Sequence, residues 1–315
     1  MRTEFNIQRE DFAMVRGRQE RGRPARESVT LTETCGRAAR APIGGRSAFS
    51  LIEIIVVVGL LTVIMLGLMM MFNQTQRVFQ TGITQVDVLD AGRAASGLLA
   101  REMEQITPSH LEDTVNFFSL TPAVTIPLVQ PLPGTGSRPR TNVMQEVFFL
   151  TRENQTWTGI GYRAYPADEG IGKLYRFVTN SNTRNPHELF QAFNDAITTN
   201  MSPVLDGVMH FKVRAYDTNG YFIRGNIGPD IYAEPSTSVG GEIYLYGFTN
   251  SAVPAAVEFE LGILENRIYD RAKALPTSTP YTSSPRYRYL TNQVGRLHVF
   301  RQLVPIRNVD PGAYQ

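Results

Sequence analysis

A run of apolar residues near the N-terminal end constrains this chain more than any other feature. Between Phe49 and Phe72 there are 24 residues, and Glu53 is the only ionisable one among them. As a helix they would reach roughly 36 Å, enough to cross a hydrocarbon core of about 30 Å with some tilt. Because a segment in lipid must satisfy its backbone groups internally, the run predicts a membrane-spanning helix.

Glu53 stands out in this run. A carboxylate deep in lipid costs on the order of 2.5–3.5 kcal/mol on insertion scales. One interpretation is that Glu53 lies near the helix end, where it reaches the headgroups or is protonated. The alternative is that it receives a cation from another chain. Its position in the run also matters, since Glu53 is the fifth residue counted from Phe49.

The sequence Phe-Ser-Leu-Ile-Glu at 49–53, followed by the aliphatic run, resembles the N-terminal signature of type IV pilins and type II secretion pseudopilins. The resemblance implies that a prepilin peptidase cuts between Ala48 and Phe49 and methylates the new amine of Phe49. It also implies that this amine pairs with Glu53 of a neighbouring subunit in the membrane during assembly. The family usually has glycine before the cut, so we expect Ala48 to slow processing.

The residues before the cut differ in charge from those after it. Residues 1–48 carry ten arginines and six acidic residues, a net charge of +4, while the rest carries 21 basic and 23 acidic residues, a net charge of −2. With few large apolar residues, segment 1–48 is predicted to be a disordered cytoplasmic leader that is cleaved off. The arginine excess predicts that the N-terminus of the apolar helix is cytoplasmic. With that orientation, the resemblance implies a single-pass protein of the inner membrane whose C-terminal domain is periplasmic.

The chain after Phe72 becomes amphipathic. Its apolar residues follow helical spacing at Phe79, Ile83, Val86, Leu89, Ala95, Leu99, Met103 and Ile106. No proline lies between Pro42 and Pro108, so one helix is predicted from Phe49 to about Ile106. The predicted organisation is a membrane helix at 49–72, an amphipathic spine helix at 73–107 whose stripe packs on a folded domain, and a β-rich domain at 108–315.

Short alternating segments follow Pro108. The predicted strands are 115–120, 146–152, 159–165, 173–179, 204–217, 221–223, 242–248, 255–264 and 297–306. Short helices are predicted at 186–197 and 268–275, and Pro- and Gly-rich loops at 122–140, 225–241 and 276–285. The fold class is therefore α+β, a long helical spine packed on an antiparallel β-rich domain, as in pilins. Segments 205–217, 254–264 and 298–307 resemble the J-type minor pseudopilin of type II secretion.

The sequence offers little that would carry chemistry. The only cysteine, Cys35, precedes the predicted cut, so the mature chain would have no disulfide, thiol catalysis or Cys-ligated metal. The four histidines lack metal-ligand spacing, and Gly159 to Ala164 matches a dinucleotide motif but opens a strand rather than a helix. Asp217-Thr218-Asn219-Gly220 is predicted to be a hairpin turn, because the further acidic ligands of a calcium loop are missing. We therefore expect no enzyme activity, no cofactor and no metal.

The resemblance to pilins and pseudopilins implies a structural role in protein transport, and the absence of a catalytic motif agrees with it. The expected function is a minor pseudopilin that starts or caps a pseudopilus of a type II secretion-like system. The expected partners are other pilin-like subunits, the prepilin peptidase and the inner-membrane secretion platform. The near-neutral mature domain gives no reason to expect nucleic-acid binding. The alternatives are a membrane-tethered periplasmic binding module that does not polymerise, and a minor pilin of a type IV pilus or DNA-uptake system.

Overall fold

The structure is a computed structural model that describes residues 49–123, 125–132, 139–181, 186–235 and 244–314. The predicted leader at 1–48, with Cys35 and Ala48, lies outside the described residues. The chain divides into two units, Met1–Thr62 and Val63–Gln315. Helix α1 (Leu51–Met103) passes through the division without a break, and all of the strands belong to the second unit.

Helix α1 confirms the predicted long helix but ends earlier than Ile106. Glu104 and Gln105 form a turn, and Ile106 is bridged to Thr151 of the sheet. Thr107 then donates its backbone N–H to the carbonyl of Leu150 at 3.0 Å. The sheet therefore takes over backbone groups that a longer helix would have used, ahead of Pro108, which disfavours helical geometry at the residue before it.

In the part of the chain that the structure describes, eleven strands follow α1. They are β1 (Leu111–Leu120), β2 (Leu128–Gln130), β3 (Arg140–Asn142), β4 (Glu146–Glu153), β5 (Thr156–Tyr165), β6 (Gly172–Ser181), β7 (Ser202–Tyr216), β8 (Ile231–Pro235), β9 (Tyr244–Asn250), β10 (Ala256–Leu264) and β11 (Leu297–Pro305). The shorter helices are α2 (His187–Asp195), α3 (Asn266–Ala274) and α4 (Pro285–Thr291).

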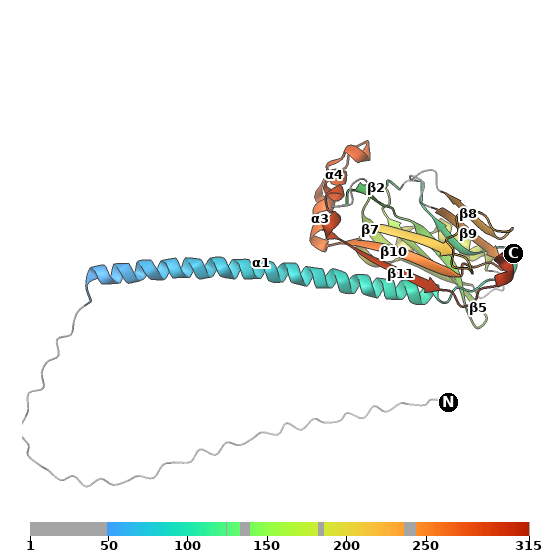
Figure 1. The fold of residues 1–315 in the computed structure, drawn as a ribbon, viewed down its shortest axis with the longest axis horizontal. Coiled ribbons are helices and arrows are strands. Elements are labelled where there is room, and N and C mark those ends of the chain that lie inside the picture. The colour runs from blue at the N-terminus through green and yellow to red at the C-terminus, as the bar shows by residue number, and fades with distance from the viewer. Residues whose placement is uncertain (1–48, 124, 133–138, 182–185, 236–243, 315) are drawn as a thin grey trace, which may run out of the picture. The chain divides into compact units, whose positions relative to one another are not determined.

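Nine of these strands form one sheet in the order β11-β10-β7-β6-β5-β4-β1-β9-β8, and β2 pairs with β3 separately (Figure 1). Every pairing between neighbours in the large sheet is antiparallel. The predicted α+β class, a long helix followed by an antiparallel sheet domain, is thus confirmed.

Alternation along β4 assigns a different layer to each face of the sheet. Val147 and Phe149 belong to the large core that includes α1 residues, whereas Phe148 and Leu150 pack with α2. Because successive side chains of a strand point to opposite faces, α1 and α2 lie on opposite sides of the sheet. A third cluster joins α3 and α4 to the α2 side of β7 through Met209.

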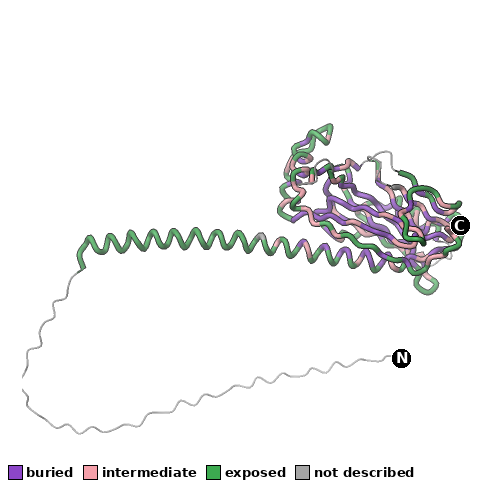
Figure 2. The backbone as a smooth tube through the Cα atoms, in the orientation of Figure 1, coloured by how far each residue is buried: buried purple, intermediate pink, exposed green. Residues whose placement is uncertain are grey.

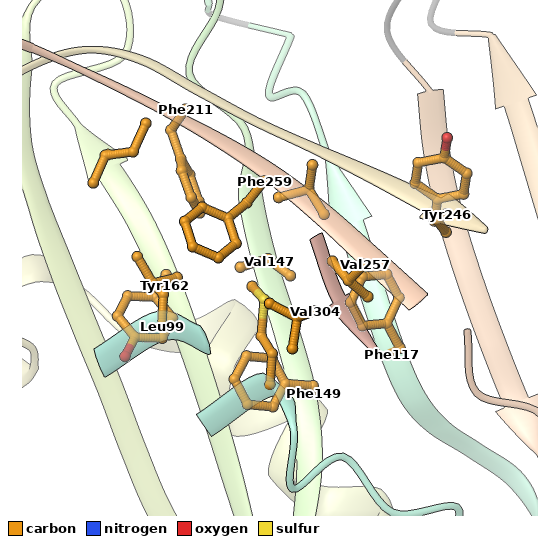
Figure 3. Close-up of a cluster of buried hydrophobic side chains, with 14 of the residues drawn as sticks. Leu99, Phe117, Val147, Phe149, Tyr162, Phe211, Tyr246, Val257, Phe259 and Val304 are labelled. Atoms are coloured by element: carbon orange, nitrogen blue, oxygen red, sulfur yellow. The ribbon is translucent and has the colours of Figure 1, made fainter. Parts of the chain in front are cut away.

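The main core lies between the second part of α1 and the sheet. Leu99 of α1 lies near Tyr162 and Phe149, and Phe211, Phe259 and Val304 continue the same layer along the neighbouring strands (Figure 3). All of these side chains are almost completely buried. At about 1.5–3 kcal/mol for each large apolar side chain removed from water, this layer is the main source of stability for the domain.

Two glycines of β5 form the floor under α2. A Cβ atom at Gly161 would overlap the ring of Phe193, and one at Gly159 would lie 3.0 Å from the Cβ of Leu189. The dinucleotide-like motif at 159–164 is therefore part of a strand, as predicted. Its glycines allow the close approach of a helix to the sheet.

Several shorter elements differ from the prediction. The turn at 218–220 is present because Asp217 Oδ1 accepts the backbone N–H groups of Asn219 and Tyr221. The strand predicted at 221–223 is wrong, since only one bridge, between Tyr216 and Phe222, forms there. Conversely, β8 lies within the loop predicted at 225–241, β2 lies within the loop predicted at 122–140, and β3 begins at its end.

Candidate membrane and assembly segment

Glu53 lies in the first turn of α1, and Phe49 lies two residues before the helix begins. The carbonyl of Ser50 accepts the backbone N–H groups of Glu53 at 3.0 Å and of Ile54 at 3.2 Å, which begins the helix. Glu53 is the acidic residue of the first turn, where the positive end of the helix dipole favours a carboxylate. Phe49 is 76% exposed. No hydrogen bond or ion pair joins the Glu53 side chain to any residue that the structure describes.

The apolar residues that follow are exposed all around the helix. Helix α1 is long and apolar enough to cross a membrane, and no part of its most apolar window is buried within the structure. Thr62, the one hydroxyl residue between Leu51 and Phe72, donates its side-chain O–H to the carbonyl of Val58 at 2.7 Å. Its polar group is therefore satisfied within the helix, as a segment in lipid requires.

The apolar stripe of the spine helix is only partly covered. Phe79, Ile83 and Val86 are more than half exposed, so their predicted packing on the domain is wrong. Burial begins at Val88, which is 2% exposed, and continues on that face through Met103 (Figure 2). Together with Val78, the three exposed residues line a shallow apolar groove on α1.

A polar network joins the last full turn of α1 to the sheet. The carboxylate of Glu102 accepts the phenol O–H of Tyr162 and two guanidinium N–H groups of Arg176, the Nε contact measuring 3.2 Å. Glu102 is 9% exposed. An unpaired carboxylate at this depth would be costly, and three charge-assisted or neutral hydrogen bonds offset that cost.

The network shifts the titration of its members. Burial raises the pKa of the Tyr162 phenol well above its ordinary value of 10.0, and the hydrogen bond to Glu102 raises it further. Burial alone would lower the pKa of Arg176, but the bonds to Glu102 outweigh burial and raise it. At neutral pH the helix is therefore held by a neutral phenol and a charged guanidinium on one carboxylate.

A second charged cluster lies on the other face of the sheet, on β7, β10 and β11. Arg214 contacts both Glu258 and Glu260 at 2.7 Å, and Arg301 holds Glu258 through two bonds of 2.8 Å. Tyr216 donates to Glu258 at 2.8 Å. These side chains alternate with the core residues of the same strands, which explains why charged residues lie within the best-paired part of the sheet.

His210 lies beneath this cluster. The Val143 backbone N–H donates to His210 Nδ1 at 3.1 Å, so the ring proton is on Nε2, which faces Glu260 Oε2 at 3.2 Å. Burial lowers the pKa of His210 below 6.5 despite the nearby carboxylate. The hydrogen bond from His210, with Arg214 and Lys212 nearby, lowers the pKa of Glu260 to about 2. His210 is thus a neutral structural residue.

Within the described residues, no three His, Cys, Asp or Glu side chains come together as a metal ion would require. Of the other histidines, His110 directly precedes β1, His187 begins α2 and His298 is the second residue of β11. Among the described residues the sites predicted from sequence are thus Glu53, in the first turn of α1, and Phe49, two residues before the helix begins.

Comparison with known proteins found little similarity. No protein-family model matches the sequence, and no curated protein matches it. Among solved structures, a type IV-like pilin from Thermus thermophilus is similar, with 13% identity and a TM-score of 0.31 over 72% of this chain and 98% of that one. At this identity and TM-score the similarity carries no argument about what this chain does.

Sequence reasoning missed Glu102, the centre of the buried polar network between α1 and the sheet. Its signal was available, because Glu102 lies beside the predicted stripe residues Leu99, Met103 and Ile106, where an acid should not face the sheet unless it is paired. Helix α4 was also missed, although Ser284 caps it by accepting the backbone N–H of Tyr287 at 3.1 Å and Pro285 is its first residue.

Proposed function

We propose that this chain is a minor pilin-like subunit, a pseudopilin that starts or caps a pseudopilus of a type II secretion-like system. The observation that carries the proposal is the continuity of α1. One helix links the Phe-Ser-Leu-Ile-Glu motif to residues built into the core of an antiparallel domain. A subunit that is pulled out of a membrane into a fibre needs such a direct link between its apolar segment and its folded part.

The environment of Glu53 supports an assembly role. It follows an exposed Phe49, it begins an exposed apolar helix, and it has no side-chain partner among the described residues. In low dielectric, a carboxylate is stabilised strongly by an ammonium close to it and poorly without one. The new amine of Phe49 on a neighbouring subunit, released by a prepilin peptidase and methylated, would supply that charge.

The proposal also fixes the topology and the partners. The arginine-rich segment 1–48 stays in the cytoplasm until it is removed, 49–72 crosses the inner membrane, 73–107 forms the spine and 108–315 is periplasmic. The partners are other pilin-like subunits, the prepilin peptidase and the secretion platform of the inner membrane.

The test is Glu53→Ala in cells that carry the assembly system. The variant should insert into the membrane at least as well as wild type, and it should still be cut after Ala48. It should fail to co-purify with other pilin-like subunits and fail to support secretion. Asp90→Ala is the matched control, since Asp90 is an exposed acid on the same helix and its one ion pair among the described residues is a 3.5 Å contact with Arg93.

Mass spectrometry of the membrane form should show a methylated N-terminus at Phe49, and Ala48→Gly should increase the processed fraction. An intact leader in cells with active peptidase would contradict the proposed cleavage. Normal assembly of Glu53→Ala would contradict the pairing role, and a membrane-tethered binding module would then account better for the chain.

A further inference from the structure

Strand β11 forms one edge of the large sheet, with β10 as its only neighbour among the described residues. An edge strand that is nine residues long offers a row of backbone groups to another chain, and natural proteins commonly cover or interrupt such edges. The hydrogen-bond pattern of the inner strands identifies which residues of β11 direct their backbone N–H and C=O groups to the open edge.

Phe211 of β7 exchanges its backbone groups with Val143 and Gln145, on the side away from β10. The partner of Phe211 on β10 is Leu261, and the partner of Leu261 on β11 is Phe300. Since the backbone groups of Phe211 point away from β10, Phe211 and Leu261 form a pair without hydrogen bonds. The backbone groups of Leu261 therefore point to the other neighbour, β11, where Leu261 and Phe300 bond to each other. Ile306 lies an even number of residues after Phe300, and it too directs its N–H away from the open edge, to the carbonyl of Ala255 at 2.9 Å.

Val299, Arg301 and Leu303 therefore direct their N–H and C=O groups to the open edge. No described residue bonds to these groups. The same three side chains lie on the outer face of the sheet, away from α1, and are exposed by 40% at Val299 and 56% at Leu303. Arg301, with 61% of its side chain exposed, lies between them.

Arg301 carries the charge of this edge. Its guanidinium holds Glu258 through two bonds of 2.8 Å, and 61% of its side chain is exposed. Arg296, directly before β11, pairs with Glu265 at 3.2 Å, and Arg307, beyond its end, lies 3.6 Å from Glu104. Residues 271–309 hold no Asp or Glu, so β11 itself offers a cation and no acid to a strand laid along it.

We propose that the edge of β11 binds an extended strand of another protein, with an acidic residue opposite Arg301 and apolar residues opposite Val299 and Leu303. Backbone bonds to the three outward residues give affinity, and the apolar–acid–apolar pattern gives specificity. A second copy of this chain is a poor occupant, because antiparallel pairing centred on this edge places Arg301 opposite itself and like charges directly opposed are destabilising. The proposal does not depend on a role in a fibre.

The experiment uses the full chain in detergent micelles and two synthetic nine-residue peptides. Both alternate Val and Thr; one has Glu at its centre, on the Val face, and the other has Lys there. The Glu peptide should bind about threefold to tenfold more tightly, the range expected for opposite against like charges across a strand pair. Amide hydrogen exchange should slow at Val299, Arg301 and Leu303 when it binds, and it should be unchanged on β7.

Leu303→Pro removes one outward N–H group and should weaken binding of the Glu peptide at least fivefold, whereas Leu303→Thr keeps the N–H and serves as the matched control. Arg301→Gln should abolish the preference between the peptides. Should Leu303→Pro fail to fold, the wild-type preference and exchange pattern decide the question. Equal binding of the two peptides, protection elsewhere, or dimers of the chain formed through β11 would overturn the proposal.

Discussion

Gly92 of α1 and Phe300 of β11 lie so close that a Cβ atom at position 92 would overlap the phenylalanine ring and lie 2.9 Å from Cδ1 of Ile263. The glycine is a gap in the helix surface that the edge strand fills. Because helix interiors disfavour glycine by about 1 kcal/mol relative to alanine, its presence here has a packing reason.

We expect Gly92→Ala to lower the free energy of unfolding by about 1–3 kcal/mol, the cost typical of overpacking. Gly97→Ala is the matched control on the same helix, because nothing lies within 4 Å of its Cβ position. That variant should be neutral or more stable by up to about 1 kcal/mol. Denaturant unfolding measures both, and equal effects of the two substitutions would contradict the close packing.

Glu102→Gln should destabilise the domain by about 1–3 kcal/mol, because Arg176 loses its charged partner and the phenol of Tyr162 loses its carboxylate acceptor. The loss stays below that for a fully buried pair because the Arg176 side chain is 29% exposed. Glu104→Gln is the control, since Glu104 makes one 3.6 Å contact with the exposed Arg307.

The stability of the domain should fall at high pH through Tyr162. Its folded-state pKa is raised above the ordinary value of 10.0, so the unfolded chain loses this proton first as the pH rises. The contribution is therefore complete below about pH 10 and declines above it. In Tyr162→Phe the free energy of unfolding, measured by denaturant at each pH, should fall less between pH 9 and pH 11 than in wild type. An equal fall in the variant would contradict the assignment.

Glu260 should make the domain sensitive to acid. Its pKa is about 2 in the folded state against 4.5 ordinarily, so its contribution is complete above about pH 4.5 and declines as the pH falls toward 2. His210 acts in the same direction, because burial lowers its pKa and the unfolded chain takes up its proton first below about pH 6.5. Glu260→Gln should be less stable at neutral pH but show a shallower loss between pH 4.5 and pH 2.

Removing the exposed part of α1 should leave the domain folded. A fragment beginning at Asp87 keeps the buried helix residues from Val88 onward, so its melting temperature should be close to that of a fragment beginning at Asn73. It should also associate less, because it lacks Phe79, Ile83 and Val86. Thermal unfolding and analytical ultracentrifugation of the two fragments test this, and a much lower melting temperature of the shorter one would show that 73–86 contribute to the fold.

The long elements could be predicted because their patterns are long. Helix α1 follows from a run without proline, and β7 and β10 follow from alternation over nine residues or more. Short elements could not be predicted, because β2, β3 and β8 have only three to five residues, too few for a local pattern, and each forms by pairing with the neighbouring strand of the chain. The predicted packing of Phe79 and Ile83 on the domain was wrong, because periodicity alone does not tell where along the helix the covering sheet ends.

In the candidate site, too, local pattern predicts some residues and not others. Phe49 and Glu53 are recognisable from the motif and its spacing, and the structure adds only where the helix begins. Glu102 depends on Tyr162 and Arg176, which are 60 and 74 residues away along the chain. No local pattern joins them, so the network becomes visible only once β5 and β6 are paired beneath the helix.

The position of Glu102 also matters for how the protein would bear load. A pull on the membrane end of α1 runs along the helix axis and slides its buried face over the strands, so the apolar contacts are loaded in shear and share the force. Helix α1 ends at Met103, far from the pulled end, and Glu102 is the residue before it. The strain would therefore reach the polar network last. Extraction of the helix would therefore begin with small slips near Val88 and end in one abrupt rupture at Glu102.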